Sequence, residues 1–324
     1  MNENDIINLI LNKFGDKYIG DDCAFLQDFG LLVSQDNLVE GTHFLRDKIT
    51  AFQLGWKSAM VNFSDILASG GECKYITIGL SLPKKVDDLE ENFVNNFFEG
   101  IKCACKEPTK FGSQKVELIG GDLTSGDKIF ISITAIGKLD DGRKFASHKN
   151  TKLGYKIVMS GECGSSDAGL QILLNDENIT RSEGLNNKWL KAHLMPKADF
   201  AASNEIGAVM AKNENNYSMI DNSDGLLFSI MRLVEPCGLG VKINFNQIRH
   251  DIELEQLQNW QKSVLFGGED YNLIACVPQD VELKHFVKIG DVVEQNGYEI
   301  DFGKNGKLFF SVNDILNKSF KHFN

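Results

Sequence analysis

Several features that would assign a protein to a familiar class are missing from this chain of 324 residues. No apolar run approaches the roughly 20 residues needed to cross a bilayer, so we expect no membrane span. The seven cysteines lack the spacing of a metal finger, and Cys103 and Cys105 have no second pair to complete a zinc site. The acidic start, residues 1–5, does not resemble a secretory signal. These absences predict a cytoplasmic protein with reduced thiols.

Basic residues are scarce relative to acidic ones: 34 Lys and Arg stand against 45 Asp and Glu, a net charge of -11. Proteins that bind the phosphates of nucleic acids use clustered Lys and Arg, so we expect no nucleic-acid partner. The same excess of acidic residues also affects the binding of a small phosphate-bearing ligand. A site lined by aspartates repels a phosphate unless cations lie between them.

Familiar catalytic signatures are absent as well. The sequence contains no HExxH, no Ser–His–Asp signature and no cysteine-nucleophile motif. Its Gly-Lys pairs are not followed by the Ser or Thr of a Walker A loop, and the HRD and DFG triplets of protein kinases are missing. A phosphotransferase with this sequence therefore belongs to neither common class.

The pattern of apolar residues predicts a mixed fold of helices and strands. A hydrophobic fraction of 42% and a charged fraction of 24% are typical of a soluble globular protein. We predict helices at 5–14, 50–69, 88–106, 167–175, 198–212 and 224–235, and strands at 31–35, 74–82, 115–119, 129–138, 155–160, 217–220 and 271–277. The polar stretch at 140–152 lacks periodicity and indicates a boundary. The pattern favours an α/β or α+β fold, with domains at 1–145 and 146–324.

Aspartate beside small residues is abundant, each time at the predicted end of a strand or helix. The segments are GDD at 20–22, SQD at 34–36, NFSD at 62–65, GGD at 120–122, DNSDG at 221–225 and GGED at 267–270. One acidic turn is ordinary, since Asp and Gly favour turns. Six of them indicate carboxylates brought together from distant segments. Because hard oxygen ligands suit Mg²⁺ and Mg²⁺ bridges to phosphates, we predict magnesium-dependent phosphoryl transfer.

Some of these segments also have ordinary structural explanations. Asp65 shares a polar stripe of its helix with Asn62, and that stripe is either turned inward or a solvated, salt-bridged face. Asp221 or Ser223 is a candidate helix N-cap, although the same turn offers N–H groups to a phosphate. The Gly/Ser loop at 161–166 could be either a turn or a phosphate cradle, and the sequence does not decide between them.

In order and spacing these motifs resemble thiamine-monophosphate kinase through almost the whole chain. VEGTHF at 39–44 and GGEDY at 267–271 point to that family and not only to its superfamily, which includes aminoimidazole ribonucleotide synthetase. The resemblance implies an aminoimidazole ribonucleotide synthetase-like fold, with an N-terminal α/β domain that dimerises and a C-terminal α+β domain. It also implies a homodimer that transfers the γ-phosphoryl group of ATP to thiamine monophosphate, giving thiamine diphosphate and ADP.

Matching motifs carry the family's site residues onto this chain. The resemblance assigns a cluster of Mg²⁺ ions to Asp22, Ser34, Gln35, Asp36, Asp65, Asp122, Asp221 and Asp224. It assigns nucleotide contacts to Gly121, His148 and Ser223, and substrate contacts to His43, Glu269 and Phe320. We assign no catalytic base, because a phosphate-oxygen nucleophile is already ionised at neutral pH and phosphoryl transfer needs positioning and charge neutralisation. Glu269 and an aromatic suit a cationic thiazolium ring.

The chain departs from the family pattern at four places. Gln35 replaces a Thr, His148 stands about where an Arg is usual near the nucleotide, the 193–197 segment lacks arginines, and Asn272 replaces a Glu. These changes leave the carboxylates intact and bear on nucleotide affinity. Two alternatives stay open: another ATP-using enzyme of the same superfamily, or a non-catalytic nucleotide-binding relative.

Overall fold

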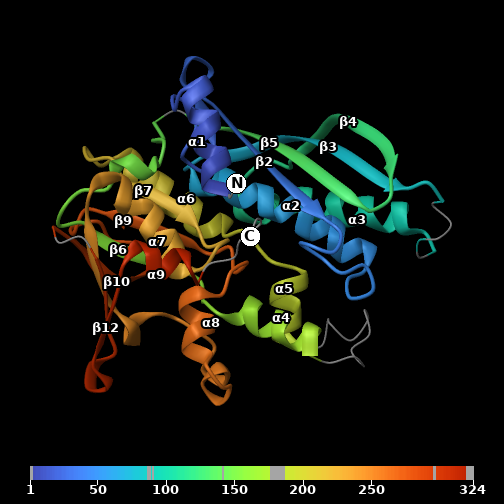
Figure 1. Cartoon of the computed structure of the whole chain (residues 1–324). Coiled ribbons are helices and arrows are strands. Elements are labelled where there is room, and N and C mark those ends of the chain that lie inside the picture. Colours follow the sequence, from blue (N-terminus) through green and yellow to red (C-terminus); the bar gives the residue numbers. More distant parts are fainter. Residues whose placement is uncertain are drawn as a thin grey trace.

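The computed structural model describes residues 3–85, 89, 91–140, 142–175, 187–294 and 297–318. Within these ranges the strands form two sheets, one from each half of the chain. Figure 1 shows the first sheet at the upper right and the second at the left, with helix α2 (Ala51–Ala68) near the centre. The mixed α/β and α+β fold predicted from the sequence is confirmed.

The first half is an open sheet with helices on one face. It contains α1 (Glu3–Phe14), β1 (Ala24–Leu26), β2 (Leu31–Val39), α2, β3 (Glu72–Pro83), α3 (Phe93–Lys106), β4 (Glu117–Gly126) and β5 (Phe130–Lys138). The strand order is β1-β2-β5-β3-β4, in which β3 and β4 are parallel and the other pairs antiparallel. Strand β4 is thus an edge strand, separated from β2 by β5 and β3.

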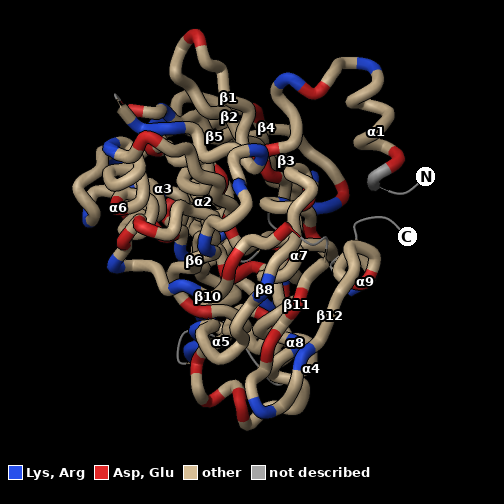
Figure 2. The backbone as a smooth tube through the Cα atoms, turned by 90° about the vertical axis from the view of Figure 1, so that its left-hand side faces the viewer, with Lys and Arg blue, Asp and Glu red and all other residues tan. Residues whose placement is uncertain are grey.

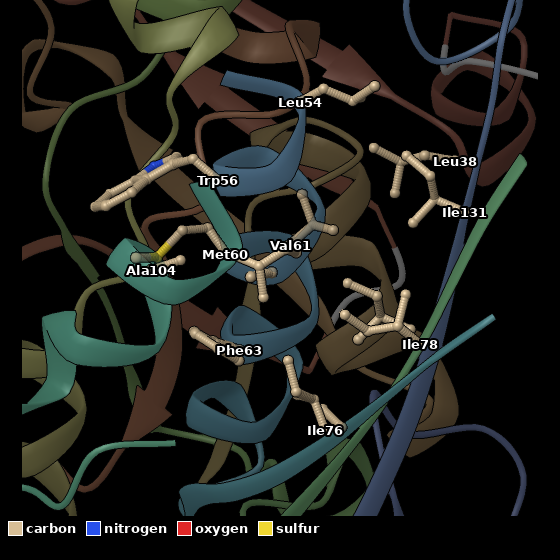
Figure 3. Packing of buried hydrophobic residues seen from close by; sticks show 14 of the residues in the cluster. Leu38, Leu54, Trp56, Met60, Val61, Phe63, Ile76, Ile78, Ala104 and Ile131 are labelled. Carbon is tan, nitrogen blue, oxygen red and sulfur yellow. The ribbon is translucent and has the colours of Figure 1, made fainter. Parts of the chain in front are cut away.

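Helix α2 is the centre of this half, because almost its whole surface is buried. A capping box on Thr50 starts the helix. Figure 3 shows apolar side chains of α2, among them Met60 and Phe63, within the core cluster. Helix α3 packs closely against α2 at Gly55, where a Cβ would lie 2.0 Å from Phe97 O. The helix therefore has little freedom to shift relative to the sheet.

The second half is a larger sheet with helices around it. Its elements are β6 (Lys156–Ser160), α4 (Ser165–Asn175), α5 (Lys188–Leu194), α6 (Phe200–Ala211), β7 (Ser218–Asp221), α7 (Leu226–Val234), β8 (Gly240–Asn244), α8 (Trp260–Phe266), β9 (Leu273–Val277), β10 (Phe286–Val293), β11 (Tyr298–Asp301), β12 (Lys307–Phe310) and α9 (Val312–Leu316). The strand order is β12-β11-β8-β10-β6-β9-β7.

The two halves share a core. Leu190, Leu194 and Phe200 of the second half belong to the apolar cluster built around α2. Trp56 of α2 also donates its Nε1–H to the carbonyl of Pro196, at 2.7 Å. The predicted domain boundary at 145–146 falls in the connection between β5 and β6. None of the described helices is both long and apolar enough to cross a membrane.

The sequence predicted every aspartate motif at the end of a strand or helix. Two of the motifs lie instead in the interior of strands. Strand β2 continues to Val39, so Asp36 lies in its interior, paired with Ile133 of β5. Strand β4 includes residues 120–122, because its pairing with β3 continues past the two glycines. Tertiary pairing thus extends both strands beyond their apolar runs.

Candidate functional site

Five aspartates from both halves of the chain converge on one place. Asp22 precedes β1, Asp36 lies in β2, Asp65 in the last turn of α2, Asp221 ends β7, and Asp224 lies in the loop before α7. The carboxylates of Asp36, Asp65 and Asp221 are each near enough to others of the five to raise their pKa values. The structure therefore brings together these five of the predicted metal ligands, in what we call the aspartate cluster.

The polar stripe of α2 is turned inward against β2. Asn62 is fully buried, and its Oδ1 accepts the backbone N–H of Asp36 at 3.0 Å. The Ser34 hydroxyl donates to Asp65 Oδ2. These bonds fix β2 and α2 relative to each other at the cluster. A solvated, salt-bridged face is therefore the wrong explanation for Asp65.

Burial and mutual repulsion disfavour the ionised carboxylates. Burial first, and then Asp224 and Asp22, raise the pKa of Asp36 to about 6. Burial, with Asp22 next, raises the pKa of Asp221 to about 8, and the pKa of Asp65 is raised well above its ordinary value, chiefly by burial. The Oδ2 atoms of Asp22 and Asp221 are buried without a hydrogen-bond partner among the described residues. Such oxygens need a positive partner, and their chemistry fits a divalent cation.

The carboxylates do not form a closed metal cage. Among the described residues, no three His, Cys, Asp or Glu side chains are already placed to hold a single ion. Mg²⁺ requires no such cage, since it usually takes one or two carboxylates and fills its shell with water and substrate phosphate. An open group of carboxylates is therefore compatible with magnesium and a phosphate ligand.

The cluster opens into a cavity of about 670 Å³. Its wall includes Gln35, Asp36, His43, Lys57, Asp65, Asp167, His193, Ser223, Asp224, Phe266, Glu269 and Tyr271. The predicted residues His43, Ser223 and Glu269 thus lie around one space with Asp36, Asp65 and Asp224 of the aspartate cluster. Its size suits a small organic ligand.

The backbone is strained where Glu269 enters this cavity. Glu269 and Tyr271 have φ values of 64° and 54°, in the left-handed region that non-glycine residues rarely adopt. Their N–H groups donate to Ser223 O at 2.7 Å and to Asn222 O at 3.1 Å, respectively. The GGEDY and DNSDG segments therefore hold each other in place. Strain of this kind persists where the surroundings over-determine the conformation, often at functional sites.

The DNSDG turn does not cap its helix with a side chain. Helix α7 begins after Gly225, whose φ is 103° and which makes no side-chain capping bond. The Ser223 hydroxyl instead donates to Asp221 Oδ1 at 2.8 Å. The N-cap explanation for Asp221 and Ser223 is therefore wrong, because both side chains are turned toward the cluster.

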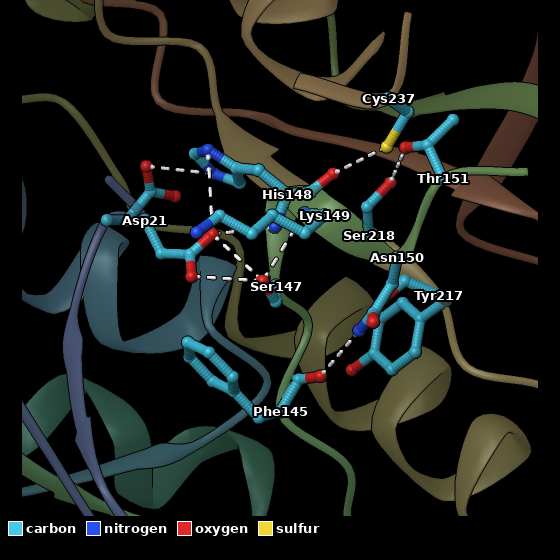
Figure 4. A network of polar contacts seen from close by, with 11 residues as sticks. Asp21, Phe145, Ser147, His148, Lys149, Asn150, Thr151, Tyr217, Ser218 and Cys237 are labelled. Carbon is cyan, nitrogen blue, oxygen red and sulfur yellow. Dashed lines mark hydrogen bonds and ion pairs between the residues drawn. The ribbon is translucent and has the colours of Figure 1, made fainter. Parts of the chain in front are cut away.

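His148 lies beside Asp22 of the cluster, and Figure 4 shows its contacts with Asp21 and Ser147. Its backbone N–H donates to Asp21 Oδ1 at 2.7 Å, and the Ser147 hydroxyl donates to the same carboxylate. The His148 Nε2 lies 3.4 Å from Asp22 Oδ1. Burial alone lowers the pKa of His148, but Asp22 and Asp21 raise it above its ordinary value. The predicted nucleotide residue thus lies beside a predicted metal ligand, whose charge favours protonation of the His148 ring.

Two predicted ligands point away from the cluster. Gln35 alternates with Ser34 and Asp36 along β2, and its Oε1 accepts from Thr134 on the exposed face of the sheet. Asp122 is exposed on the edge strand β4, opposite Gly79 of β3. Since neighbouring strands lie about 4.8 Å apart, three spacings separate β4 from β2 by roughly 14 Å. Within one chain the structure does not bring Gly121 and Asp122 to the aspartate cluster.

The undecided loop at 161–166 is a structural turn. Asp270 accepts the backbone N–H of Gly164 at 2.6 Å and that of Ser166 at 3.0 Å. The Cys163 N–H also donates to Arg249 O at 3.0 Å, so three backbone donors of this loop are already used, which favours a turn. Burial raises the pKa of Asp270 to about 7 despite these bonds.

Three site residues were missed from the sequence: Lys57, His193 and Asp270. Lys57 is a charged residue inside an otherwise apolar helical pattern, and that signal could have identified it. Phe320 lies outside the described residues. Asn272, a departure from the family, is buried and pairs with Asn222 at 3.0 Å, so it links the same two ligand-bearing segments.

Charge is mixed over the described chain, with Lys and Arg positions scattered among Asp and Glu in both halves (Figure 2). Lys149 lies 3.7 Å from Asp16 and lines a second cavity of about 300 Å³, together with the stacked rings of Phe25 and Phe145. Lys144 donates to the carbonyls of Asn213 and Asn215 and is held away from the cluster. Of these two lysines, Lys149 is therefore the one near the Asp21–His148 side of the site.

Comparison with known proteins gives consistent matches. Residues 20–139 match the family model described as AIR synthase related protein, N-terminal domain. A thiamine-monophosphate kinase of Aquifex aeolicus is 32% identical over 327 residues, covering 98% of this chain and 97% of that protein. The Escherichia coli protein of the same name is 32% identical over 282 residues, which cover 82% of this chain and 80% of that protein.

Solved structures agree with the sequence comparison. A complex of AaThiL with AMPPCP and TMP has a TM-score of 0.83 to this chain at 32% identity, covering 99% of this chain and 97% of that one. Hydrogenase maturation protein HypE has a TM-score of 0.59 at 17% identity, and the match covers 94% of this chain and 96% of the HypE chain. At this identity the likeness concerns the fold alone.

Proposed function

The chain belongs to the thiamine-monophosphate kinase family, and on this basis we propose that it transfers the γ-phosphoryl group of ATP to the phosphate of thiamine monophosphate. The products are thiamine diphosphate and ADP. The observation that carries the proposal is the aspartate cluster at one end of a cavity whose wall also holds His43 and Glu269. Such a site can bind two phosphate-bearing substrates only with cations between them.

Mg²⁺ would be held by the aspartate cluster, with Ser34 oriented toward it through Asp65. When bound, the metal neutralises the charge of the phosphates and orients them for in-line transfer. The unpartnered oxygens of Asp22 and Asp221 support this assignment. No side chain is needed as a base, because the attacking oxygen of a phosphate monoester is ionised at neutral pH.

His43 is suited to donate a hydrogen bond to the acceptor phosphate. Its Nδ1 accepts the backbone N–H of Val39 at 3.0 Å. The proton of the neutral ring is therefore on Nε2. On the nucleotide side, Ser223 lines the cavity, and His148 stands about where the family has an arginine, with its pKa raised by Asp22 and Asp21.

The exposed position of Asp122 is explained if the active protein is a homodimer. Leu118, Ile119 and Leu123 on β4 are 48%, 55% and 71% exposed, an apolar edge that a second copy would cover. We assign Gly121 and Asp122 to the site of the partner subunit, since they cannot reach the cluster of their own chain. The protein is then a cytoplasmic dimer with two shared sites.

Complementation tests this assignment. Asp65→Asn and Asp122→Asn each keep the fold and remove activity. A mixed population refolded from both variants forms heterodimers with one intact site out of two, so activity returns to roughly a quarter of wild type. Failure to recover activity, with heterodimers present, would place Asp122 in its own chain's site or outside any site.

A direct assay tests the reaction itself. The protein with ATP, Mg²⁺ and thiamine monophosphate should form thiamine diphosphate, detected by chromatography, and EDTA should stop the reaction. Turnover of another phosphate acceptor in a substrate panel would favour a different enzyme of the superfamily. ATP binding without any turnover would favour a non-catalytic relative.

A further inference from the structure

A buried charged network lies in the wall of the cavity, outside the roles assigned so far. Lys57 is in the interior of α2, and its side chain is only 2% exposed. Its Nζ lies 3.0 Å from Oε1 and 3.1 Å from Oε2 of Glu269. Among the described residues that line the cavity, Lys57 is the only Lys or Arg. Burying a lysine in this way is costly unless its charge is paired, as it is here.

His193 of α5 completes the network from the other half of the chain. Its Nδ1 lies 3.1 Å from Glu269 Oε2 and 3.1 Å from Ser166 Oγ. Burial, and then Lys57, lower the pKa of His193 to about 3, so the ring is neutral. Nδ1 shares a hydrogen bond with the Ser166 hydroxyl, so the ring is anchored to α4 while it lies against Glu269. Glu269 is thus held between α2 and α5.

We propose that Lys57 is a positioning residue for the acceptor substrate: with His193, it holds Glu269 ionised and oriented toward the cationic ring of the acceptor. This inference rests on the proposed function. A carboxylate has about four acceptor positions. Lys57 donates to Oε2 and its Nζ also lies 3.0 Å from Oε1, so at least one acceptor position of the carboxylate stays open. The Glu269 side chain remains 30% exposed, which leaves that position accessible to a ligand.

The electrostatics of Glu269 support the same role. Burial raises the pKa of this carboxyl, but Lys57 of α2, His193 of α5 and His43 of the loop after β2 together lower it below the ordinary value. The neighbouring Asp270 acts against them by repulsion. Without Lys57, less positive charge would oppose the burial of Glu269, which favours the neutral form of its carboxyl. A neutral Glu269 would not attract a cation.

Steady-state kinetics of Lys57→Met test the proposal, since Met keeps the volume and removes the charge. The KM for thiamine monophosphate should rise about tenfold or more, while kcat and the KM for ATP stay near wild type. The rise in KM should be larger at pH 6 than at pH 8, because loss of the Lys57 charge raises the pKa of the Glu269 carboxyl. Lys102→Met, which breaks an exposed ion pair with Glu99, is the matched control and should change nothing.

A double-mutant cycle separates action through Glu269 from direct contact with substrate. If Lys57 acts through Glu269, adding Lys57→Met to Glu269→Gln causes little further rise in KM. If the two substitutions raise KM by independent factors that multiply in the double variant, the proposal is overturned. An unchanged KM in Lys57→Met alone would also overturn it. A loss of kcat with KM unchanged would also overturn it.

The state of His193 gives a readout that is independent of activity. In ¹⁵N-edited NMR spectra of the whole protein, His193 should stay neutral from pH 5 to 8, and it is assigned by comparison with His193→Gln. In Lys57→Met the ring ¹⁵N shifts of His193 should change because the neighbouring charge is gone, although burial, the main cause of its low pKa, still keeps the ring neutral. A His193 that behaves identically in both proteins would refute the network. If wild type forms no thiamine diphosphate, the proposed function fails, and the NMR result still decides whether the network exists.

Discussion

Protons and Mg²⁺ compete for the aspartate cluster, so the metal-free protein should lose stability as the pH rises from 6 to 8. The Asp221 carboxyl has an ordinary pKa of 3.8 and a pKa of about 8 in the folded protein. Between these values the folded state binds the proton and the unfolded state does not, so stability falls with rising pH. Integrated from pH 6 to 8, Asp221 alone lowers the free energy of unfolding by roughly 2 kcal/mol.

Other buried groups modify this value. Asp36 and Asp270, with pKa values of about 6 and about 7, contribute with the same sign. His193 opposes them, because its folded pKa of about 3 means that only the unfolded state gains a proton near pH 6. That opposition is roughly 1 kcal/mol. The net loss from these four groups is roughly 3 kcal/mol, which for a chain of this length lowers Tm by roughly 4 °C. Asp65, whose pKa burial also raises, adds to the loss with the same sign.

Calorimetry in EDTA at pH 6, 7 and 8, repeated with saturating Mg²⁺, measures the effect. Tm in EDTA should fall across the series, and Mg²⁺ should stabilise the protein more at pH 8 than at pH 6, because metal ligands must be deprotonated. Asp221→Asn should flatten the pH dependence in EDTA. A Tm that is constant or rises toward pH 8 in EDTA would refute the reasoning, as would equal stabilisation by Mg²⁺ at both pH values.

Two further substitutions test the scaffold. Trp56→Phe removes the buried bond to Pro196 O and should lower the free energy of unfolding by about 1–3 kcal/mol, measured by urea denaturation; an unchanged midpoint would contradict that role. Gly225→Ala forces a side chain onto a φ of 103°, within 2.8 Å of the Phe266 backbone. It should displace Asp224 and reduce kcat/KM at least ~10-fold while circular dichroism is preserved, and full activity would show that the turn tolerates strain.

The elements that carry the site could be predicted where local sequence determines them. Helix α2 was expected at 50–69 and is found at Ala51–Ala68, because its apolar residues recur at helical spacing over its whole length. The convergence of Asp22, Asp36, Asp65 and Asp221 was also predicted, from the number of acidic segments at element ends. Local pattern and tertiary structure agree in this part of the chain.

The remaining features depend on contacts that one sequence does not display. A lysine in a helix is normally a surface residue, and only the packing of α5 and the GGEDY segment onto α2 shows that Lys57 is buried and paired. The position of Asp122 follows from strand order, which places β4 at the far edge of the sheet. Asp270 belongs to one of the six acidic segments but was given no role from the sequence, and the structure shows that it holds the backbone of the 161–166 loop.

Helix α2 connects the two ends of the proposed reaction. Asp65 and Lys57 are eight residues apart, which is roughly 12 Å along the axis, and both side chains line the same cavity. The Asp65 end belongs to the aspartate cluster, and the Lys57 end fixes the carboxylate that would meet the cationic ring. Because α2 is buried on nearly all sides and held by α3 and β2, this separation cannot vary freely. An acceptor must therefore present its phosphate and its cation at a matching distance, and the rigidity of one helix becomes a constraint on substrate choice.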